Sequence, residues 1–265
     1  MAKKKDNGYL SARESRRISR ENRKITDALE AKRKRKNVPE SEYTTQMHDP
    51  ANALEVDGLF TWFYTDTGTV HSVDGVSFDV PMGKTVGIVG ESGCGKSVTS
   101  LSIMQLLQRP QGQVVDGEIR LNIGGGKAID VTKAPEAVMQ QLRGNRISMI
   151  FQEPMTALNP VFRIGEQLDE VIALHDGDGK SAEDVKKRTI EMLELVGIAN
   201  SQGVYAMYPH ELSGGMRQRV MIAMALCCNP GIIIADEPTT ALDVTIQAQI
   251  LDLLRNLKDK INSSI

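Results

Sequence analysis

The spacing of apolar residues changes several times along the chain, and each change predicts an element. Runs typical of β-strands occur at about 53–63, 69–80 and 117–123. Short continuous apolar runs, typical of strands buried on both faces, occur at 85–89, 147–151 and 232–236. Helical spacing occurs at 96–107, 160–200, 213–228 and 245–260, with Ser181 as a predicted N-cap. Strands that alternate with helices predict an α/β fold.

The first 48 residues have a different character. Residues 1–40 carry 14 Lys and Arg against 6 Asp and Glu, whereas the rest of the chain carries 18 against 28. No strand signal is present, so residues 1–48 are expected to form a basic tail that is disordered or partly helical. A thin apolar stripe supports the helical alternative, and contact with an anionic membrane or with nucleic acid stays open. The stripe consists of Leu10, Ile18, Ile25 and Leu29.

Composition excludes several other classes of protein. No run of 18 or more apolar residues occurs, so the chain itself is not expected to span a membrane. The three cysteines, Cys94, Cys227 and Cys228, lack CxxC spacing, which argues against a redox or zinc site. Any role in transport therefore requires a separate membrane partner.

A glycine-rich segment follows the apolar run at 85–89. Residues 90–97 fit G-x-x-x-x-G-K-[ST], which predicts a loop whose backbone N–H groups bind phosphate oxygens. Lys96 is expected to reach the β- and γ-phosphates as a catalytic group, and the Ser97 hydroxyl to bind Mg²⁺. The alternative, a tight glycine turn with an exposed lysine, does not explain why a helix follows the loop. The residues expected to contact ATP here are Gly90, Glu91, Ser92, Gly93, Cys94, Gly95, Lys96, Ser97 and Val98.

An acidic pair follows the apolar run at 232–236. Asp236 is expected at the carboxyl end of a strand, where ligands bind in open α/β sheets. It is predicted to contact the nucleotide site and to hold Mg²⁺ through water, while Glu237 orients and polarises the attacking water. A surface Asp-Glu pair before a proline turn is the alternative, and the phosphate loop favours the catalytic interpretation.

A second candidate anion site lies at the start of the helix expected at 213–228. Residues 212–218, LSGGMRQ, resemble the LSGGQ signature of the ATP-binding-cassette family, with Met216 in place of the usual Gln. The resemblance implies contacts with ATP held by the phosphate loop of a second subunit. A plain helix N-cap with glycines fits the local chemistry equally well. The residues implied are Ser213, Gly214, Gly215 and Gln218.

Other positions of this family also have counterparts. Gln152 resembles the Q-loop glutamine, which implies contact with the nucleotide, Mg²⁺ and the catalytic site, at the side of the membrane partner. Residues 241–243 resemble the D-loop that crosses the dimer interface. The resemblance also implies an aromatic side chain stacked on adenine, and spacing favours Phe63 over its neighbours Trp62 and Tyr64.

The segments between motifs resemble the peptide and nickel importer branch of the family. Residues 149–160, 208–211 and 236–245 carry this resemblance, which extends over about 54–265. It implies a P-loop NTPase with a RecA-like core sheet, a β-rich N-terminal subdomain and a helical subdomain. The nucleotide-binding domain is expected at 49–265 and its helical subdomain at about 153–212.

The same resemblance implies partners and a location. The chain is expected to bind ATP and Mg²⁺ and to hydrolyse ATP as a subunit of a membrane importer for oligo- or dipeptides. ATP-driven dimerisation with an identical or homologous ATPase subunit would drive two membrane-spanning permease subunits that receive solute from an extracellular solute-binding protein. The expected location is peripheral, at the cytoplasmic face of the plasma membrane, and no nucleic acid is expected as a partner.

One feature departs from the family pattern. The family has a further strand and a switch histidine after the D-loop helix, whereas this chain stops at Ile265. The histidines, His48, His71, His175 and His210, all precede that position. We therefore expect a C-terminally truncated chain that binds ATP with poor or absent turnover.

Two other functions remain as alternatives. The first is a soluble cassette ATPase of nucleic-acid or translation metabolism, but neither a second cassette nor a coiled-coil insertion is visible. The second is a small-molecule P-loop kinase, against which the motif at 212–218 argues, because a kinase needs no dimer signature. An inactive fragment is a separate possibility that concerns the state of the chain.

Overall fold

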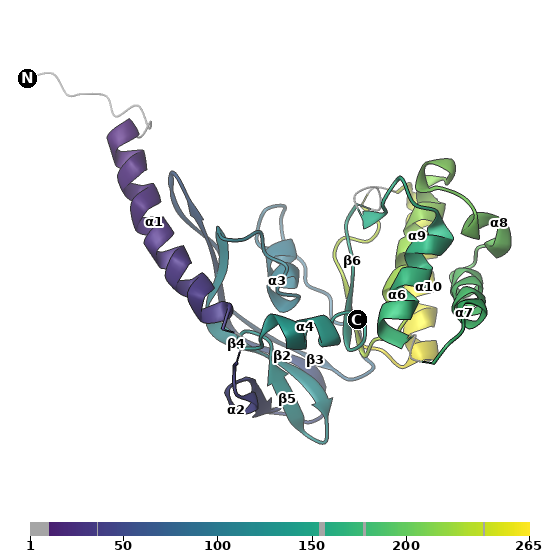
Figure 1. The fold of residues 1–265 in the computed structure, drawn as a ribbon, viewed down its shortest axis with the longest axis horizontal. Coiled ribbons are helices and arrows are strands. Elements are labelled where there is room, and N and C mark those ends of the chain that lie inside the picture. Colours follow the sequence, from purple (N-terminus) through teal and green to yellow (C-terminus); the bar gives the residue numbers. More distant parts are fainter. Residues whose placement is uncertain (1–10, 36, 154–156, 177–178, 241) are drawn as a thin grey trace, which may run out of the picture.

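The computed structural model describes residues 11–35, 37–153, 157–176, 179–240 and 242–265. Leu10 of the predicted stripe, residues 154–156 and Ala241 of the predicted D-loop lie outside the described residues. An antiparallel sheet with α1 (Ala12–Arg33) forms one end of the molecule, and a group of helices forms the other (Figure 1). Two parallel strands, β6 (Ile147–Ile150) and β7 (Ile232–Ala235), lie between these parts (Figure 1).

The antiparallel sheet confirms the predicted β-rich N-terminal part. Its five strands run in the order β1 (Thr44–Gln46), β5 (Lys127–Asp130), β4 (Gly112–Gly124), β2 (Asn52–Thr65) and β3 (Gly68–Pro81). One face is apolar because alternate side chains point to the same side of a strand. Leu54, Leu59 and Ile119 are among the fully buried residues of that core.

The parallel pair confirms two of the three predicted buried strands. Its register runs from Ile147 opposite Ile232 to Ile150 opposite Ala235. The third prediction, a buried strand at 85–89, is wrong, since Ile88 is 48% and Val89 93% exposed. The backbone hydrogen bonds between this segment and Ile265 involve only Lys84 and Val86 among the described residues. An apolar run without a backbone partner along its whole length does not form a strand.

The helices confirm the predicted helical segments. α3 (Lys96–Ile103) and α4 (Glu136–Leu142) lie near the antiparallel sheet, and α6 (Ile164–Asp176), α7 (Ala182–Leu195), α8 (Ser201–Tyr205), α9 (Gly214–Leu226) and α10 (Val244–Ile261) lie at the opposite end (Figure 1). Ser181 begins α7 as predicted, with a reciprocal capping box to Asp184. A short 3-10 helix (Pro209–Glu211) precedes α9. Within the described part of the chain, no helix combines the length and apolarity needed to cross a bilayer.

The N-terminal segment follows the helical alternative of the predicted basic tail and not the disordered one. α1 has 22 residues and begins at a capping box between Ser11 and Glu14, and Glu40–Tyr43 forms the short helix α2. The expectation of no strand is wrong, because β1 pairs with β5. Polar contacts hold α1: Asn22 donates to the carbonyl of Thr65 at 2.8 Å. Of the predicted apolar stripe, Ile25 is 43% exposed, whereas Ile18 and Leu29 are half-buried.

Candidate functional site

The loop at 90–97 follows a path that requires glycine at two positions. Gly95 precedes α3 as its N-cap with φ +96°, and a Cβ there would lie 2.3 Å from the carbonyl oxygen of Ser72. Gly93 also has a positive φ, +82°, but open space around it. The loop is therefore pressed against β3 at Gly95 and leads directly into the first turn of α3, whose N–H groups face an incoming anion.

Lys96 projects back across the loop that precedes it. Its ammonium donates to the carbonyl oxygens of Gly90 at 2.9 Å and Glu91 at 3.0 Å. It also lies 3.6 Å from a carboxylate oxygen of Glu237. The structure thus places a positive charge between the loop and the acidic strand end.

Ser97 and Asp236 meet across the site. The Ser97 hydroxyl donates to Oδ1 of Asp236 at 2.9 Å, and the Asp236 backbone N–H donates to the carbonyl of Ile150 at 3.0 Å. Asp236 directly follows β7, so the parallel pair fixes its position. A hydroxyl and a carboxylate oxygen side by side are the kind of ligands that Mg²⁺ prefers.

Glu237 joins the site to Gln152. Gln152 donates from Nε2 to Oε2 of Glu237 at 2.9 Å, although the two residues are far apart in sequence. Thr240 donates to the same oxygen at 3.1 Å. Thr240 was not among the predicted site residues, and the only signal for it was its place shortly after the acidic pair. Glu237 has φ +45°, a strained value for a residue with a side chain, and strain of this kind is concentrated at functional sites.

The signature segment lies at the start of α9. Ser213 is the N-cap and accepts from the N–H of Met216 at 3.3 Å, while Gly215 packs closely against Ile246 of α10. Among the described residues, no hydrogen bond joins Ser213, Gly214 or Gly215 to the loop at 90–97. Contact of Ser213, Gly214 and Gly215 with a nucleotide on a second subunit stays a prediction.

Gln218 requires a correction. Its side chain is buried, with 1% of the residue exposed, and its Nε2 donates to the carbonyl of Pro238 at 2.6 Å. An amide that is buried and bonded within the chain does not face a ligand. The structure therefore favours a positioning role, in which Gln218 ties α9 to the loop that carries Glu237, over the predicted contact with nucleotide.

Phe63 lies on the opposite face of the antiparallel sheet from its neighbours Trp62 and Tyr64, because successive side chains of a strand alternate between faces. Thr61 hydrogen-bonds with Ser102 of α3 at 2.8 Å, and Phe63, two residues further along β2, lies on the same face. Trp62 lies opposite Gln113 of β4, whose side chain bonds to Glu30 of α1. Trp62 therefore lies on the other face of the sheet, toward α1, and its indole ring stacks on the His71 ring. Only Phe63 of the three aromatic residues at 62–64 thus lies on the side of the helix that follows the phosphate loop.

Taken together, an α/β core in which a glycine loop begins a helix beside an acidic strand end defines a P-loop NTPase. The family model for "ABC transporter" matches residues 73–240, and the chain belongs to this family.

Relatives and solved structures agree with this assignment. The oligopeptide transport ATP-binding protein AppD of Bacillus subtilis is 52% identical over 212 residues, which are 80% of this chain and 62% of AppD. The glutathione import ATP-binding protein GsiA of Salmonella typhimurium is 48% identical over 217 residues, 82% of this chain and 34% of GsiA. The dimeric, post-hydrolysis structure of the ATP-binding cassette MJ0796 with ADP and phosphate has a TM-score of 0.69 and 26% identity, covering 79% of this chain and 84% of that one. The chain spans about three fifths of the length of AppD.

Proposed function

We propose that this chain binds ATP with Mg²⁺ and hydrolyses it as the ATPase subunit of a membrane importer for oligo- or dipeptides. The observation that carries the proposal is the convergence of Lys96, Ser97, Gln152, Asp236 and Glu237, which come from three separate parts of the sequence. Each has the chemistry that phosphoryl transfer needs.

Binding is the first step of the proposed function. The loop residues Gly90 to Val98 surround the phosphates, and the Lys96 ammonium exchanges its bonds to the loop carbonyls for bonds to phosphate oxygens. Ser97, Asp236 and Gln152 would hold Mg²⁺, which neutralises charge on the phosphates when bound. Phe63, on the face of the sheet toward α3, is the proposed adenine contact.

Hydrolysis depends on the carboxylate of Glu237. Gln152 and Thr240 both donate to its Oε2, which leaves Oε1, the atom nearest Lys96, to accept a proton from water. Two donors to one oxygen also fix the rotamer of the carboxylate. A fixed carboxylate supports the proposed water-positioning role of Glu237.

The relatives support the proposed transport role. AppD is named for oligopeptide transport, and GsiA for glutathione import. The solved cassette MJ0796 is a dimer, which supports a second ATPase subunit as partner. Ser213, Gly214 and Gly215 would then complete the nucleotide site of that second subunit. We infer two permease subunits, an extracellular solute-binding protein and a peripheral position at the cytoplasmic face of the plasma membrane. The helices within about 153–212 are the proposed docking site for the permease subunits.

Two substitutions test the ATPase assignment. Lys96→Ala should weaken ATP binding at least about 100-fold, since it removes charge-assisted bonds to phosphate. Glu237→Gln should leave ATP binding within about threefold and reduce turnover at least about 100-fold in the complex with the permease subunits. Calorimetry measures the binding and phosphate release measures the turnover.

A matched control separates these effects from a general loss of charge. Lys127, on strand β5, is an exposed lysine remote from the loop, and Lys127→Ala should change neither property. Unchanged ATP binding by Lys96→Ala would refute the binding site. Unchanged turnover by Glu237→Gln would remove Glu237 from the catalytic role.

A further inference from the structure

The loop at 237–240 begins in a conformation that its own sequence does not favour. Glu237 has φ +45°, in a region that residues with a side chain rarely adopt. Pro238 comes next, and the residue before a proline is ordinarily extended. Because both local preferences oppose this backbone, contacts from elsewhere in the chain have to hold it.

One of these contacts comes from α9. Only 1% of Gln218 is exposed, and its Nε2 donates to the carbonyl oxygen of Pro238 at 2.6 Å. This carbonyl belongs to the residue directly after Glu237, so the bond fixes the peptide group that joins Pro238 to Thr239. Since the amide is buried, water does not replace the donor when the side chain is changed.

A second contact comes from α10. Gln247 donates from Nε2 to the carbonyl oxygens of Thr239 at 3.1 Å and Leu242 at 3.0 Å. The amide carries two hydrogens, so it can serve both oxygens at once. Two glutamines from two helices thus hold the carbonyls of the two consecutive residues that follow Glu237, namely Pro238 and Thr239.

The Glu237 side chain is held by residues of the nucleotide site. Gln152 and Thr240 both donate to its Oε2, and the Lys96 ammonium lies 3.6 Å from its Oε1. Rotation about φ carries the whole side chain with it. A relaxed backbone at Glu237 would therefore displace the carboxylate from these partners.

We propose that Gln218 and Gln247 are positioning residues for hydrolysis, which keep Glu237 in the left-handed region and its carboxylate at the nucleotide site. This role rests on the proposed ATPase function, and it acts through the loop backbone and not through contact with the nucleotide. Gln218 lies on the helix that Ser213 caps. The segment predicted to contact the nucleotide of a second subunit and one support of Glu237 therefore belong to the same helix.

Gln218→Leu and Gln247→Leu remove the two donors with side chains of similar bulk. Gln249 provides the matched control on α10, two residues after Gln247. It is exposed, and its side chain accepts from Arg219 at 3.4 Å instead of bonding to the loop. Gln249→Leu thus changes the same kind of side chain without touching the support of Glu237.

Crystal structures of the full-chain variants test the position of Glu237 directly. In Gln218→Leu and in Gln247→Leu we expect φ of Glu237 to leave the left-handed region and the bond from Gln152 to be lost. Gln249→Leu should leave both features unchanged. An unaltered Glu237 in either of the first two variants would remove that glutamine from the positioning role.

Turnover in the complex with the permease subunits is the second readout. Gln218→Leu and Gln247→Leu should lower kcat about tenfold and change the Kd for ATP less than about twofold, because the loop at 90–97 keeps its contacts. A residue that only stabilises the fold would lower the midpoint of urea denaturation and leave kcat per folded subunit unchanged. That result would overturn the role.

Gln218→Glu supplies a rescue by pH and a second variant that does not depend on the folding of Gln218→Leu. A carboxyl group donates only when it is protonated, and burial raises its pKa. The turnover of this variant relative to wild type should therefore rise as the pH falls from about 9 to about 6. A ratio that does not change with pH would refute the need for a donor at Pro238.

Failure of the ATPase function is distinguishable from failure of the positioning role. A wild-type complex without turnover would refute the ATPase function. The crystal structures would still decide whether Gln218 and Gln247 hold Glu237.

Discussion

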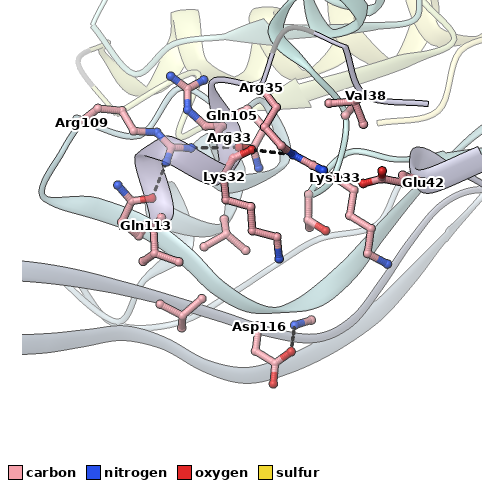
Figure 2. Close-up of a pocket in the computed structure, with 16 residues that line it drawn as sticks. Lys32, Arg33, Arg35, Val38, Glu42, Gln105, Arg109, Gln113, Asp116 and Lys133 are labelled. Carbon is pink, nitrogen blue, oxygen red and sulfur yellow. Dashed lines mark hydrogen bonds and ion pairs between the residues drawn. The ribbon is translucent and has the colours of Figure 1, made fainter. Parts of the chain in front are cut away.

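Two regions of this molecule gather positive charge in different ways. The loop at 90–97 does so within eight consecutive residues, through backbone N–H groups and one lysine. The cavity at the carboxyl-terminal end of α1 does so with basic side chains from three separate stretches, residues 32–35, Arg109 and Lys133, which only the tertiary structure brings together (Figure 2). The first kind of arrangement can be recognised from sequence, whereas the second becomes visible only in the folded chain.

The two regions also differ in what keeps their donors in place. The loop depends on backbone conformation, with positive φ values at Gly93 and Gly95. The cavity depends on ion pairs, with Glu30 shared among three cations. Substitution of a glycine should therefore affect the first region most strongly, and substitution of a carboxylate the second.

The largest effect on stability is expected at Gly95. In Gly95→Ala the new Cβ would lie 2.3 Å from the carbonyl oxygen of Ser72, at a φ that disfavours any side chain. We expect a loss of about 3 kcal/mol from the free energy of unfolding, with weakened ATP binding. Urea denaturation and calorimetry measure the two quantities.

Gly93→Ala is the matched control for this prediction. Gly93 also has a positive φ, but a Cβ at this position would meet no atom of the described residues within 4 Å beyond its chain neighbours. Its cost should be limited to backbone strain of about 1 kcal/mol. Equal losses at Gly93 and Gly95 would show that the contact with β3 does not constrain the loop.

The second prediction concerns the ionic contacts of α1. Glu30→Ala removes the acceptor of Arg109 and Gln113 and should reduce the free energy of unfolding by about 2 kcal/mol. Hydrogen exchange should show faster opening of α1 than in the wild type. Asp27→Ala breaks only the exposed pair with Arg23 and should cost less than about 0.5 kcal/mol. A Glu30 variant as stable as the Asp27 variant would show that the ion pairs do not hold α1.

Much of the fold, and which candidate site residues lie close together, could be predicted from the sequence. β2, β3, β4, β6 and β7 occur where apolar periodicity placed them, and Ser181 caps α7 as expected. The structure also brings Ser97 to Asp236 and Gln152 to Glu237, while the roles inferred for these residues from the motifs stay predictions. The predicted strands and the Ser181 cap are confirmed because the local pattern and the tertiary structure favour the same arrangement.

The remaining features depend on contacts that a local pattern does not contain. The run at 85–89 has the composition of a buried strand, yet a strand also needs a backbone partner along its length. α1 docks through Asn22 and Glu30, whereas polar residues in a basic segment ordinarily indicate a solvated tail. Gln218 is buried against Pro238, which its place in the signature did not predict.

The third and smallest of the main predictions, control variants aside, concerns Glu55, a carboxylate held by both backbone N–H groups and an ion pair. Glu55 is 2% exposed and accepts from the N–H groups of Asp49 at 2.8 Å and His48 at 2.9 Å, while Arg120 lies 3.8 Å away. Burial raises the pKa of Glu55, but the bonds from Asp49 and His48 outweigh burial and hold that pKa below its ordinary value of 4.5. The Glu55 carboxylate is thus a negative charge held mainly by backbone N–H donors, the same kind of donor that the phosphate loop offers to an anion.

The lowered pKa of Glu55 determines the sign of a pH effect. Because the folded-state pKa lies below 4.5, the carboxylate contributes stability above that pH, and the contribution is lost as the pH falls through the folded-state pKa. Glu55→Gln should cost about 1 kcal/mol near neutral pH, and its difference from wild type should shrink as the pH falls from about 6 to about 3. Urea denaturation of both proteins across this range measures the difference. If the difference in the free energy of unfolding did not change with pH, the loss in Glu55→Gln would come from poorer packing of the amide. The backbone donors of Asp49 and His48 would then not favour the charged form of Glu55.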